Sequence, residues 1–177
     1  DTKTRRPIVG MPVISVKIGD HCYHGLCDMG ASASATPYDL YKEIMHDIAP
    51  AEIEDIDVTI KLANRDTVKP VGIVRDVEVL CGKVKYPANF LVLGSPQDDF
   101  CHIIFGRPFL NTVNARIDSE NDTVTIGLED VSHAFNFAKF HRQPRDRESP
   151  SKDEIIGLAS IVVPPTDLLA QYLLDHE

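Results

Sequence analysis

One acidic residue stands where an apolar segment meets a turn built from small residues. The segment reads Gly25-Leu26-Cys27-Asp28-Met29-Gly30-Ala31-Ser32. A glycine in such a turn lets another backbone or a ligand approach closely, and loops at strand ends often carry functional side chains. A carboxylate in this place could act as a general acid or base, or it could simply cap the turn. Asp28 on its own does not distinguish these two roles.

Two cysteines and two histidines lie just before Asp28 and could suggest a zinc site. They are His21, Cys22, His24 and Cys27. Their spacing matches no zinc-knuckle pattern, and no second Cys/His pair follows at finger spacing. Reduced thiols on strands are the favoured interpretation, and we predict no metal and no other cofactor. The chain's four cysteines fit a reducing compartment better than a disulfide framework at this length.

A second motif begins at Ile103, 75 residues after Asp28, where an apolar run ends in Gly106-Arg107. A guanidinium is planar and carries several donors, so this arginine could bridge several acceptors; otherwise it is an ordinary surface residue. Between the two motifs lies a hairpin candidate, from Leu62 to Ile73. Three further acids, Asp98, Asp99 and Asp118, are best interpreted as solvated turn carboxylates.

The order of these features, acid-Gly-Ala, hairpin, then apolar run and Gly-Arg, resembles the retropepsin-like aspartic proteases. The strongest similarity is to the protease segment of plant gypsy-type LTR retrotransposon polyproteins. The second motif of that protease segment is matched here by Gly106-Arg107-Pro108-Phe109-Leu110-Asn111-Thr112-Val113-Asn114-Ala115-Arg116-Ile117-Asp118. The resemblance covers roughly residues 8–140, and an ordered set of motifs is more specific than any one of them.

The resemblance implies a homodimeric aspartic endopeptidase. Each retropepsin chain supplies one Asp, so the catalytic pair forms across a two-fold axis. The roles implied are catalytic for Asp28; the active-site turn for Met29, Gly30, Ala31 and Ser32; the flap over the substrate for Val71, Gly72 and Ile73; and support of the active site and dimer for Gly106 and Arg107. The implied substrate is the chain's own polyprotein, and the implied location is intracellular, cytoplasmic or in virus-like particles.

Two positions depart from the family pattern. Active retropepsins usually have Thr or Ser after the catalytic Asp, and that hydroxyl bonds across the dimer; this chain has Met29, which donates no hydrogen bond. Ser32 stands where retroviral enzymes tend to place a second acid. An alternative is therefore a catalytically inactive retropepsin-fold module for dimerisation or protein binding. A further alternative is an interaction partner that binds elsewhere through its C-terminal tail.

Strands must position these motifs. Apolar β-branched residues alternate with polar ones in the segments 13–19, 57–62, 77–79 and 124–126, which is typical of half-buried strands. Thr36-Pro37 predicts the start of a helix with an apolar stripe, and a shorter helical turn is expected at residues 108–112. We therefore predict an all-β fold, a retropepsin-like closed antiparallel barrel or sandwich with one or two short helices.

Composition and charge limit the domain organisation of the chain and the partners that it can bind. The chain has 177 residues with 27 acids against 18 bases, and a formal charge of -9 opposes binding to nucleic acid or to an anionic membrane. No apolar run approaches the roughly 20 residues that span a bilayer. We expect a protease-like domain at residues 1–140, a polar linker at 141–154, and a C-terminal strand and helix at 155–177.

Overall fold

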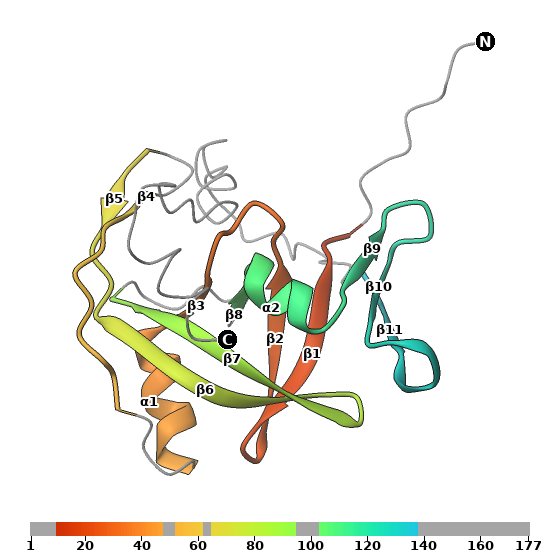
Figure 1. Ribbon diagram of the computed structural model, residues 1–177, viewed down its shortest axis with the longest axis horizontal. Helices are drawn as coiled ribbons and strands as arrows, with labels where there is room; N and C mark the ends of the chain where they lie inside the picture. The colour runs from red at the N-terminus through yellow and green to blue at the C-terminus, as the bar shows by residue number, and fades with distance from the viewer. Residues whose placement is uncertain (1–9, 48–51, 62–64, 95–102, 138–177) are drawn as a thin grey trace, which may run out of the picture.

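The computed structural model describes residues 10–47, 52–61, 65–94 and 103–137. Its main feature is a closed barrel of six strands in the order β1-β2-β8-β3-β7-β6 (Figure 1). These strands are β1 (Val13–Ile18), β2 (His21–Cys27), β3 (Ser34–Pro37), β6 (Gly72–Cys81), β7 (Val84–Leu93) and β8 (Ile103–Phe105). Two helices, α1 (Tyr38–Asp47) and α2 (Arg107–Thr112), accompany the barrel, which confirms the predicted fold class.

Alternating residues build the barrel wall as expected from their pattern. In β1 the side chains of Ile14, Val16 and Ile18 are buried, while Ser15 between them is exposed. β1 pairs with β2 in antiparallel register. The turn that joins them contains Gly19, whose φ of 59° is a conformation that glycine adopts at little cost. The period-two pattern thus identified both the strand and its inward face.

The central strand β8 determines where the two sequence motifs meet. It runs parallel to β2, with Cys27 opposite Phe105, and antiparallel to β3, with Ala35 opposite Ile104. The carboxyl ends of two parallel strands lie at the same edge of a sheet. The residues after β2 and those after β8 are therefore neighbours, although they are far apart in the sequence.

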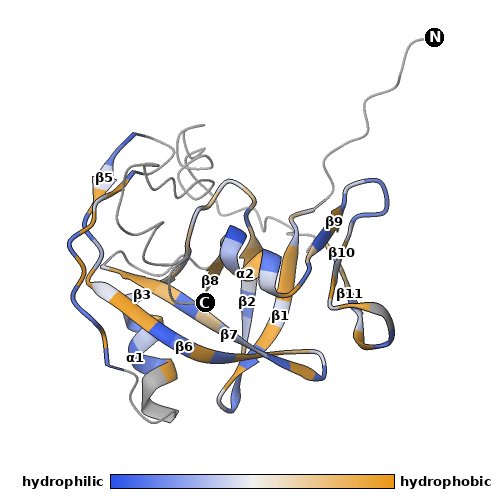
Figure 2. Ribbon diagram, viewed as in Figure 1, coloured by the Kyte–Doolittle hydropathy of each residue, from blue (hydrophilic) through white to orange (hydrophobic). Residues whose placement is uncertain are grey.

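Aromatic packing fills the core beneath this edge. The rings of Phe105 and Phe109 stack with their centroids 4.2 Å apart, and Phe90 lies 6.1 Å from Phe105. A Cβ at Gly25 would lie 2.1 Å from a ring atom of Phe105, so the ring occupies the space that a side chain would need. Apolar residues concentrate on the barrel strands, whereas the loop between β9 and β10 is hydrophilic (Figure 2).

A second, smaller sheet lies beside the barrel. Its strand order is β11-β10-β9, built from β9 (Arg116–Asp118), β10 (Thr123–Ile126) and β11 (His133–Asn136). A 3₁₀ turn, η1 (Glu129–Val131), lies between β10 and β11. The short hairpin of β4 (Ile60–Lys61) and β5 (Thr67–Val68) makes a third sheet. β9 to β11 follow α2 directly along the chain.

Two local predictions need correction. Thr36 and Pro37 belong to β3, where they pair with β7, and the helix begins only at Tyr38. The Thr36 hydroxyl is buried with no hydrogen-bond partner among the described residues, so it does not cap α1. The strand expected at residues 57–62 begins only at Ile60 and includes Lys61, while residue 62 lies outside the described residues. In both places the pairing partners, and not the local pattern, fix where the element begins.

Within the described ranges, no helix is long and apolar enough to cross a membrane. The expected linker at residues 141–154 and the tail at 155–177 lie outside the described residues.

Candidate active site

Asp28 follows directly after β2 and begins a tight turn. Its backbone N–H donates to the carbonyl oxygen of Phe105 at 3.0 Å, which ties the turn to β8. The Ala31 N–H donates to the Asp28 carbonyl oxygen at 3.1 Å, and the Gly30 N–H donates to Asp28 Oδ1 at 2.8 Å. The turn is therefore closed by its own hydrogen bonds and anchored to a neighbouring strand.

Arg107, the first residue of α2, contacts the same turn. Its backbone N–H donates to the Ala31 carbonyl oxygen at 2.9 Å. Its Nη1 lies 3.2 Å from the Met29 carbonyl oxygen and 3.4 Å from that of Gly30. The structure thus brings the acidic motif and the Gly-Arg motif together within one chain. Any contact of Arg107 across a dimer stays a prediction.

Gly106 lies against β3 with no room for a side chain. A Cβ at this position would lie 2.5 Å from both the carbonyl carbon and the carbonyl oxygen of Ala33. The Gly106 N–H donates to Ser34 Oγ at 3.0 Å, and Ser34 is buried. Sequence reasoning missed this serine. The run of small residues from Ala31 to Ala35 was the available signal, because only small side chains permit such close backbone packing.

The two carboxylate oxygens of Asp28 have different surroundings. Oδ1 accepts the Gly30 N–H, whereas Oδ2 is buried without a hydrogen-bond partner among the described residues. Burial raises the pKa of Asp28 above its ordinary value of 3.8, and it outweighs the opposing effects of the Gly30 and Ala31 N–H groups and the Arg107 charge. Asp28 therefore holds a proton more readily than a solvated aspartate, and its Oδ2 accepts no hydrogen bond from the described residues.

Met29 and Ser32 occupy different environments in the turn. The Met29 side chain is 58% exposed, immediately beside the acid. Ser32 is half-buried, two residues before β3 begins. The surface next to Asp28 is therefore apolar at the position where the family pattern has a hydroxyl.

Val71, Gly72 and Ile73 are the residues that the resemblance assigns to a flap. Gly72 and Ile73 begin β6 and pair with β7 in the barrel wall. Ile73 is 1% exposed, and its N–H and carbonyl both bond to the backbone of Glu54. A Cβ at Gly72 would lie 2.4 Å from the Glu54 carbonyl oxygen. Gly72 and Ile73 are therefore packed on both sides in this structure, and a flap role for Val71, Gly72 and Ile73 stays a prediction.

The hairpin that precedes them is β4–β5. Ile60 pairs with Val68 and Lys61 with Thr67. Part of its turn, residues 62–64, lies outside the described residues. The apolar Val-Gly-Ile segment resembled a flexible tip, but it continues the alternation of a barrel strand. This hairpin is the element nearest to the expected flap in the sequence.

The other acids singled out in the sequence differ from Asp28. Asp118 Oδ1 accepts the N–H groups of Glu120 and Asn121, at 2.9 and 3.1 Å, and its Oδ2 accepts from Asn121 Nδ2 at 2.7 Å. The Asn121 side chain contributes most to lowering the pKa of Asp118. This carboxylate is a solvated turn cap. Asp98 and Asp99 lie outside the described residues.

The Cys/His group before Asp28 is spread over β2. Cys22 and His24 are exposed, whereas Cys27 lies on the buried face. In the described parts of the chain, no three His, Cys, Asp or Glu side chains come together as a metal site. Burial raises the pKa of the Cys81 thiol to about 12, and Cys101 lies outside the described residues.

Neither a family model nor a curated protein matches the sequence, but solved structures resemble the fold. The retroviral protease-like domain of Ddi1 from Leishmania major aligns with a TM-score of 0.53 and 18% identity, over 77% of this chain and 100% of that one. EIAV protease, in complex with the inhibitor HBY-793, aligns with a TM-score of 0.50 and 17% identity, over 65% of this chain and 99% of that one. The chain has a retropepsin-like acid-protease fold.

Proposed function

We propose that this chain is an aspartic endopeptidase of retropepsin type that works as a homodimer. The observation that carries the proposal is Asp28 Oδ2, which is buried and without a partner among the described residues, in a turn anchored by β8 and Arg107. Asp28 of a second chain would supply the missing partner on a two-fold axis. The fold's likeness to a retroviral protease-like domain and to EIAV protease supports this assignment.

The chemistry follows from placing two carboxyl groups in contact. They share one proton, because two negative charges at that distance repel each other strongly. The ionised carboxylate takes a proton from a water molecule, whose oxygen attacks the carbonyl carbon of the scissile peptide bond. The protonated carboxyl gives its proton to the carbonyl oxygen. The carboxyl that took the water proton then gives it to the amide nitrogen, the other carboxylate takes a proton from one hydroxyl of the tetrahedral intermediate, and the C–N bond breaks to leave an amine and a carboxylic acid.

The proposed substrate is an extended, largely apolar segment of the chain's own polyprotein. The motif order, from the Asp28 turn to the segment 106–118, supports an origin in a plant gypsy-type LTR retrotransposon. A protease of that origin would act in the cytoplasm or inside virus-like particles.

Met29 favours a second candidate, an inactive module for dimerisation or protein binding. Its exposed side chain lies beside Asp28 and offers no hydroxyl to hold two acidic turns together. An aspartic dyad tolerates little misplacement, so a looser dimer would bind peptides without cleaving them.

A cleavage experiment separates the two candidates. The wild type, Asp28→Asn and the matched control Asp118→Asn are incubated at high concentration with a library of extended peptides at about pH 5, near the upper pKa of an aspartic dyad. We expect the wild type and Asp118→Asn to cleave the same peptides. Asp28→Asn removes the group that exchanges protons with water and substrate, and should be slower by about a thousandfold or more.

Two other outcomes would contradict the protease. Equal cleavage by Asp28→Asn and the wild type would show that another group performs the chemistry. No cleavage by any variant, from folded protein shown to be dimeric by sedimentation, would favour the binding module.

A further inference from the structure

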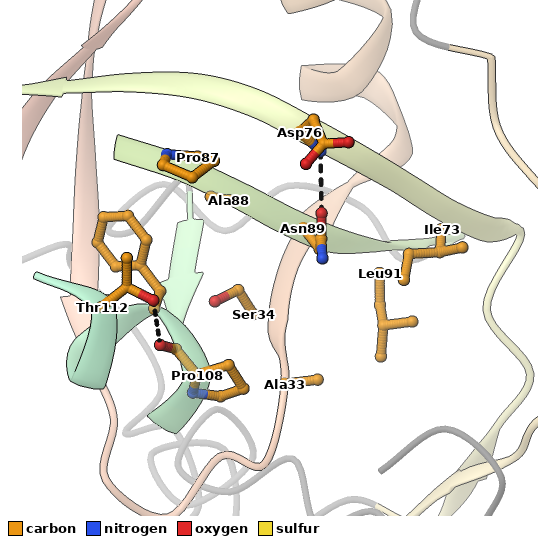
Figure 3. Close-up of a pocket in the computed structure, with 11 residues that line it drawn as sticks. Ala33, Ser34, Ile73, Asp76, Pro87, Ala88, Asn89, Leu91, Pro108 and Thr112 are labelled. Atoms are coloured by element: carbon orange, nitrogen blue, oxygen red, sulfur yellow. Dashed lines mark hydrogen bonds between the residues drawn. The ribbon is translucent and has the colours of Figure 1, made fainter. Parts of the chain in front are cut away.

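A hollow of about 310 Å³ opens between the β6–β7 wall, the start of β3 and helix α2 (Figure 3). Asp28 does not line it, but the hollow adjoins the active-site turn along the chain. Its lining residue Ala33 comes five residues after Asp28, and Pro108 directly follows Arg107. Most of its wall is apolar, with Ile73 and Leu91 among the contributors. The hollow is large enough to hold one side chain of a bound peptide.

The polar part of the wall is formed by Asp76 and Asn89. Asp76 lies in an irregularity of β6 between Val74 and Val77, with a φ of 53°. Its backbone N–H donates to Asn89 Oδ1 at 2.9 Å (Figure 3). An N–H can bond only to the oxygen of a carboxamide, so this contact fixes which side of the Asn89 amide carries Nδ2. The wall thus combines a donor of fixed orientation with the Asp76 carboxylate, which only accepts.

The Asp76 carboxylate and Asn89 Nδ2 together indicate which chemical class of ligand the hollow would bind. A carboxamide has an NH₂ that can donate to Asp76 and a carbonyl oxygen that can accept from Asn89 Nδ2. A lysine or arginine head group could donate to Asp76, but it has no acceptor for Asn89 Nδ2 and would leave that donor unpaired. A ligand carboxylate would be repelled by Asp76. Ser34, whose hydroxyl also lines the hollow, can either donate or accept.

We propose that this hollow binds the carboxamide side chain of a glutamine or asparagine in a peptide. The inference rests on the proposed function for its role: the bound residue would lie a few positions from the scissile bond and would set substrate preference. Apolar walls from Pro87 and Pro108 would pack against the methylene groups of the ligand, while Asp76 and Asn89 recognise its amide.

Binding is measured without relying on cleavage. The full chain carrying Asp28→Asn, labelled with ¹⁵N, is titrated with N-acetylglutamine methylamide and with the corresponding lysine and glutamate compounds. We expect the amide signals of Ala88 and Asn89 to shift most with the glutamine probe. Its Kd should be about fivefold lower than those of the other two probes, the effect of one hydrogen bond.

Asn89→Asp, added to the same protein, is the sharpest test. It keeps the shape and the acceptor for the Asp76 N–H but turns the Nδ2 donor into an acceptor. The preference should reverse, with the lysine probe binding about fivefold tighter than the glutamine probe. Asn111→Asp on exposed α2 surface makes the same charge change outside the hollow and should leave the glutamine preference unaltered.

A second variant covers the case in which Asn89→Asp does not fold. Asp76→Asn keeps the backbone donor, and asparagine also tolerates a positive φ. It should remove the discrimination against the glutamate probe. Equal affinities for all three probes, or identical behaviour of Asn89→Asp and Asn111→Asp, would overturn the carboxamide site.

The failure of one proposal can be told from the failure of the other. Selective glutamine binding by a chain that cleaves nothing would support the site but overturn its role in a protease. Cleavage by the wild type with no preference for Gln or Asn near the scissile bond, and no selective binding, would overturn this inference alone.

Discussion

Two turns in this chain begin with an aspartate at the end of a strand, and they hold their carboxylates in opposite ways. Both oxygens of Asp118 accept hydrogen bonds, and its pKa is lowered. One oxygen of Asp28 is buried without a partner among the described residues, and its pKa is raised. The first arrangement completes a turn. The second leaves one carboxylate oxygen buried and without a hydrogen bond from the described residues.

The contacts that hold these turns also differ in the sequence separation of the residues that make them. Asp118 is bonded by residues two and three positions away in the sequence. The Asp28 turn is held by Phe105 and by Arg107, whose Nη1 bonds the Met29 carbonyl 78 positions away. A carboxylate with local partners is stable wherever its turn forms. The geometry of the Asp28 turn exists only when the barrel closes. Substitutions in the barrel should therefore disturb the Asp28 turn and leave the Asp118 turn intact.

The largest effect on stability is expected from Gly106→Ala. The added Cβ would overlap the backbone of Ala33, so β3 or α2 must move. We expect a loss of about 2–3 kcal/mol in the free energy of unfolding, measured with urea. The Asp28 turn should be disturbed while the Asp118 turn keeps its geometry, as the amide signals of Gly30 and Asn121 would report.

Gly94→Ala is the matched control, because the nearest atom to its Cβ, in Val71, would be 3.9 Å away. Equal destabilisation by the two substitutions would contradict the close packing of Gly106 against β3.

Arg107→Lys should have the next largest effect. An ammonium keeps the charge but cannot reproduce the planar group that lies against the carbonyls of Met29 and Gly30. We expect peptide cleavage to fall about tenfold with folding preserved, because the turn loses a charge-assisted hydrogen bond. Arg116→Lys in exposed β9 should leave cleavage unaltered. A fully active Arg107→Lys would show that the turn is held without the guanidinium.

Met29→Thr should tighten the dimer. The exposed methionine offers no hydrogen bond across a two-fold axis, whereas a threonine hydroxyl can donate one and accept one. The dissociation constant, measured by sedimentation equilibrium, should fall about fivefold for each hydrogen bond gained. Met29→Leu keeps an apolar side chain and should not tighten the dimer. Weaker association of Met29→Thr than of Met29→Leu would mean that apolar contact holds the interface.

The smallest expected effect is on the pH dependence of stability. Asp28 and Asp118 should change the free energy of unfolding in opposite directions as the pH rises. The pKa of Asp28 is higher in the folded chain than in the unfolded one, so its stabilising contribution is complete below pH 3.8 and is lost as the pH rises through the folded value. The pKa of Asp118 is lowered, so its contribution is present above pH 3.8 and is lost as the pH falls through the folded value.

Asn substitutions should therefore act in opposite directions at pH 7. Asp28→Asn should unfold at a higher urea concentration than the wild type, and Asp118→Asn at a lower one. Urea titrations of monomeric protein between pH 3 and 7 measure both. Shifts of the same sign at pH 7 would mean that burial does not govern Asp28.

Sequence reasoning worked best where structure depends on near neighbours. The alternation in β1 was recognised because the side chains of a strand repeat every two residues. The short helix α2 was expected at the right place from Pro108 onward. Its first residue, Arg107, was expected to reach the acidic turn only through the resemblance to a family.

The errors arose where pairing partners decide the structure. The segment Val71–Ile73 was assigned to a flap through the family resemblance, and only the structure shows that Gly72 and Ile73 pair with β7 and that Ile73 bonds to Glu54. Pro37 resembled the first residue of a helix, yet pairing with Leu93 retains it in β3. No local pattern encodes these partners, because each contact depends on the register of a strand from another part of the chain.

The sequence by itself determined the alternation and inward face of β1 and the identity of the acid at the end of β2. The tertiary structure alone decided that Asp28 is partly dehydrated and that Ser34 meets Gly106. It also decided that Asp76 and Asn89 share the wall of a hollow. The physical reason is that alternation and turn chemistry act over a few residues. Burial and hydrogen-bond satisfaction depend instead on which distant strands the closed barrel places side by side.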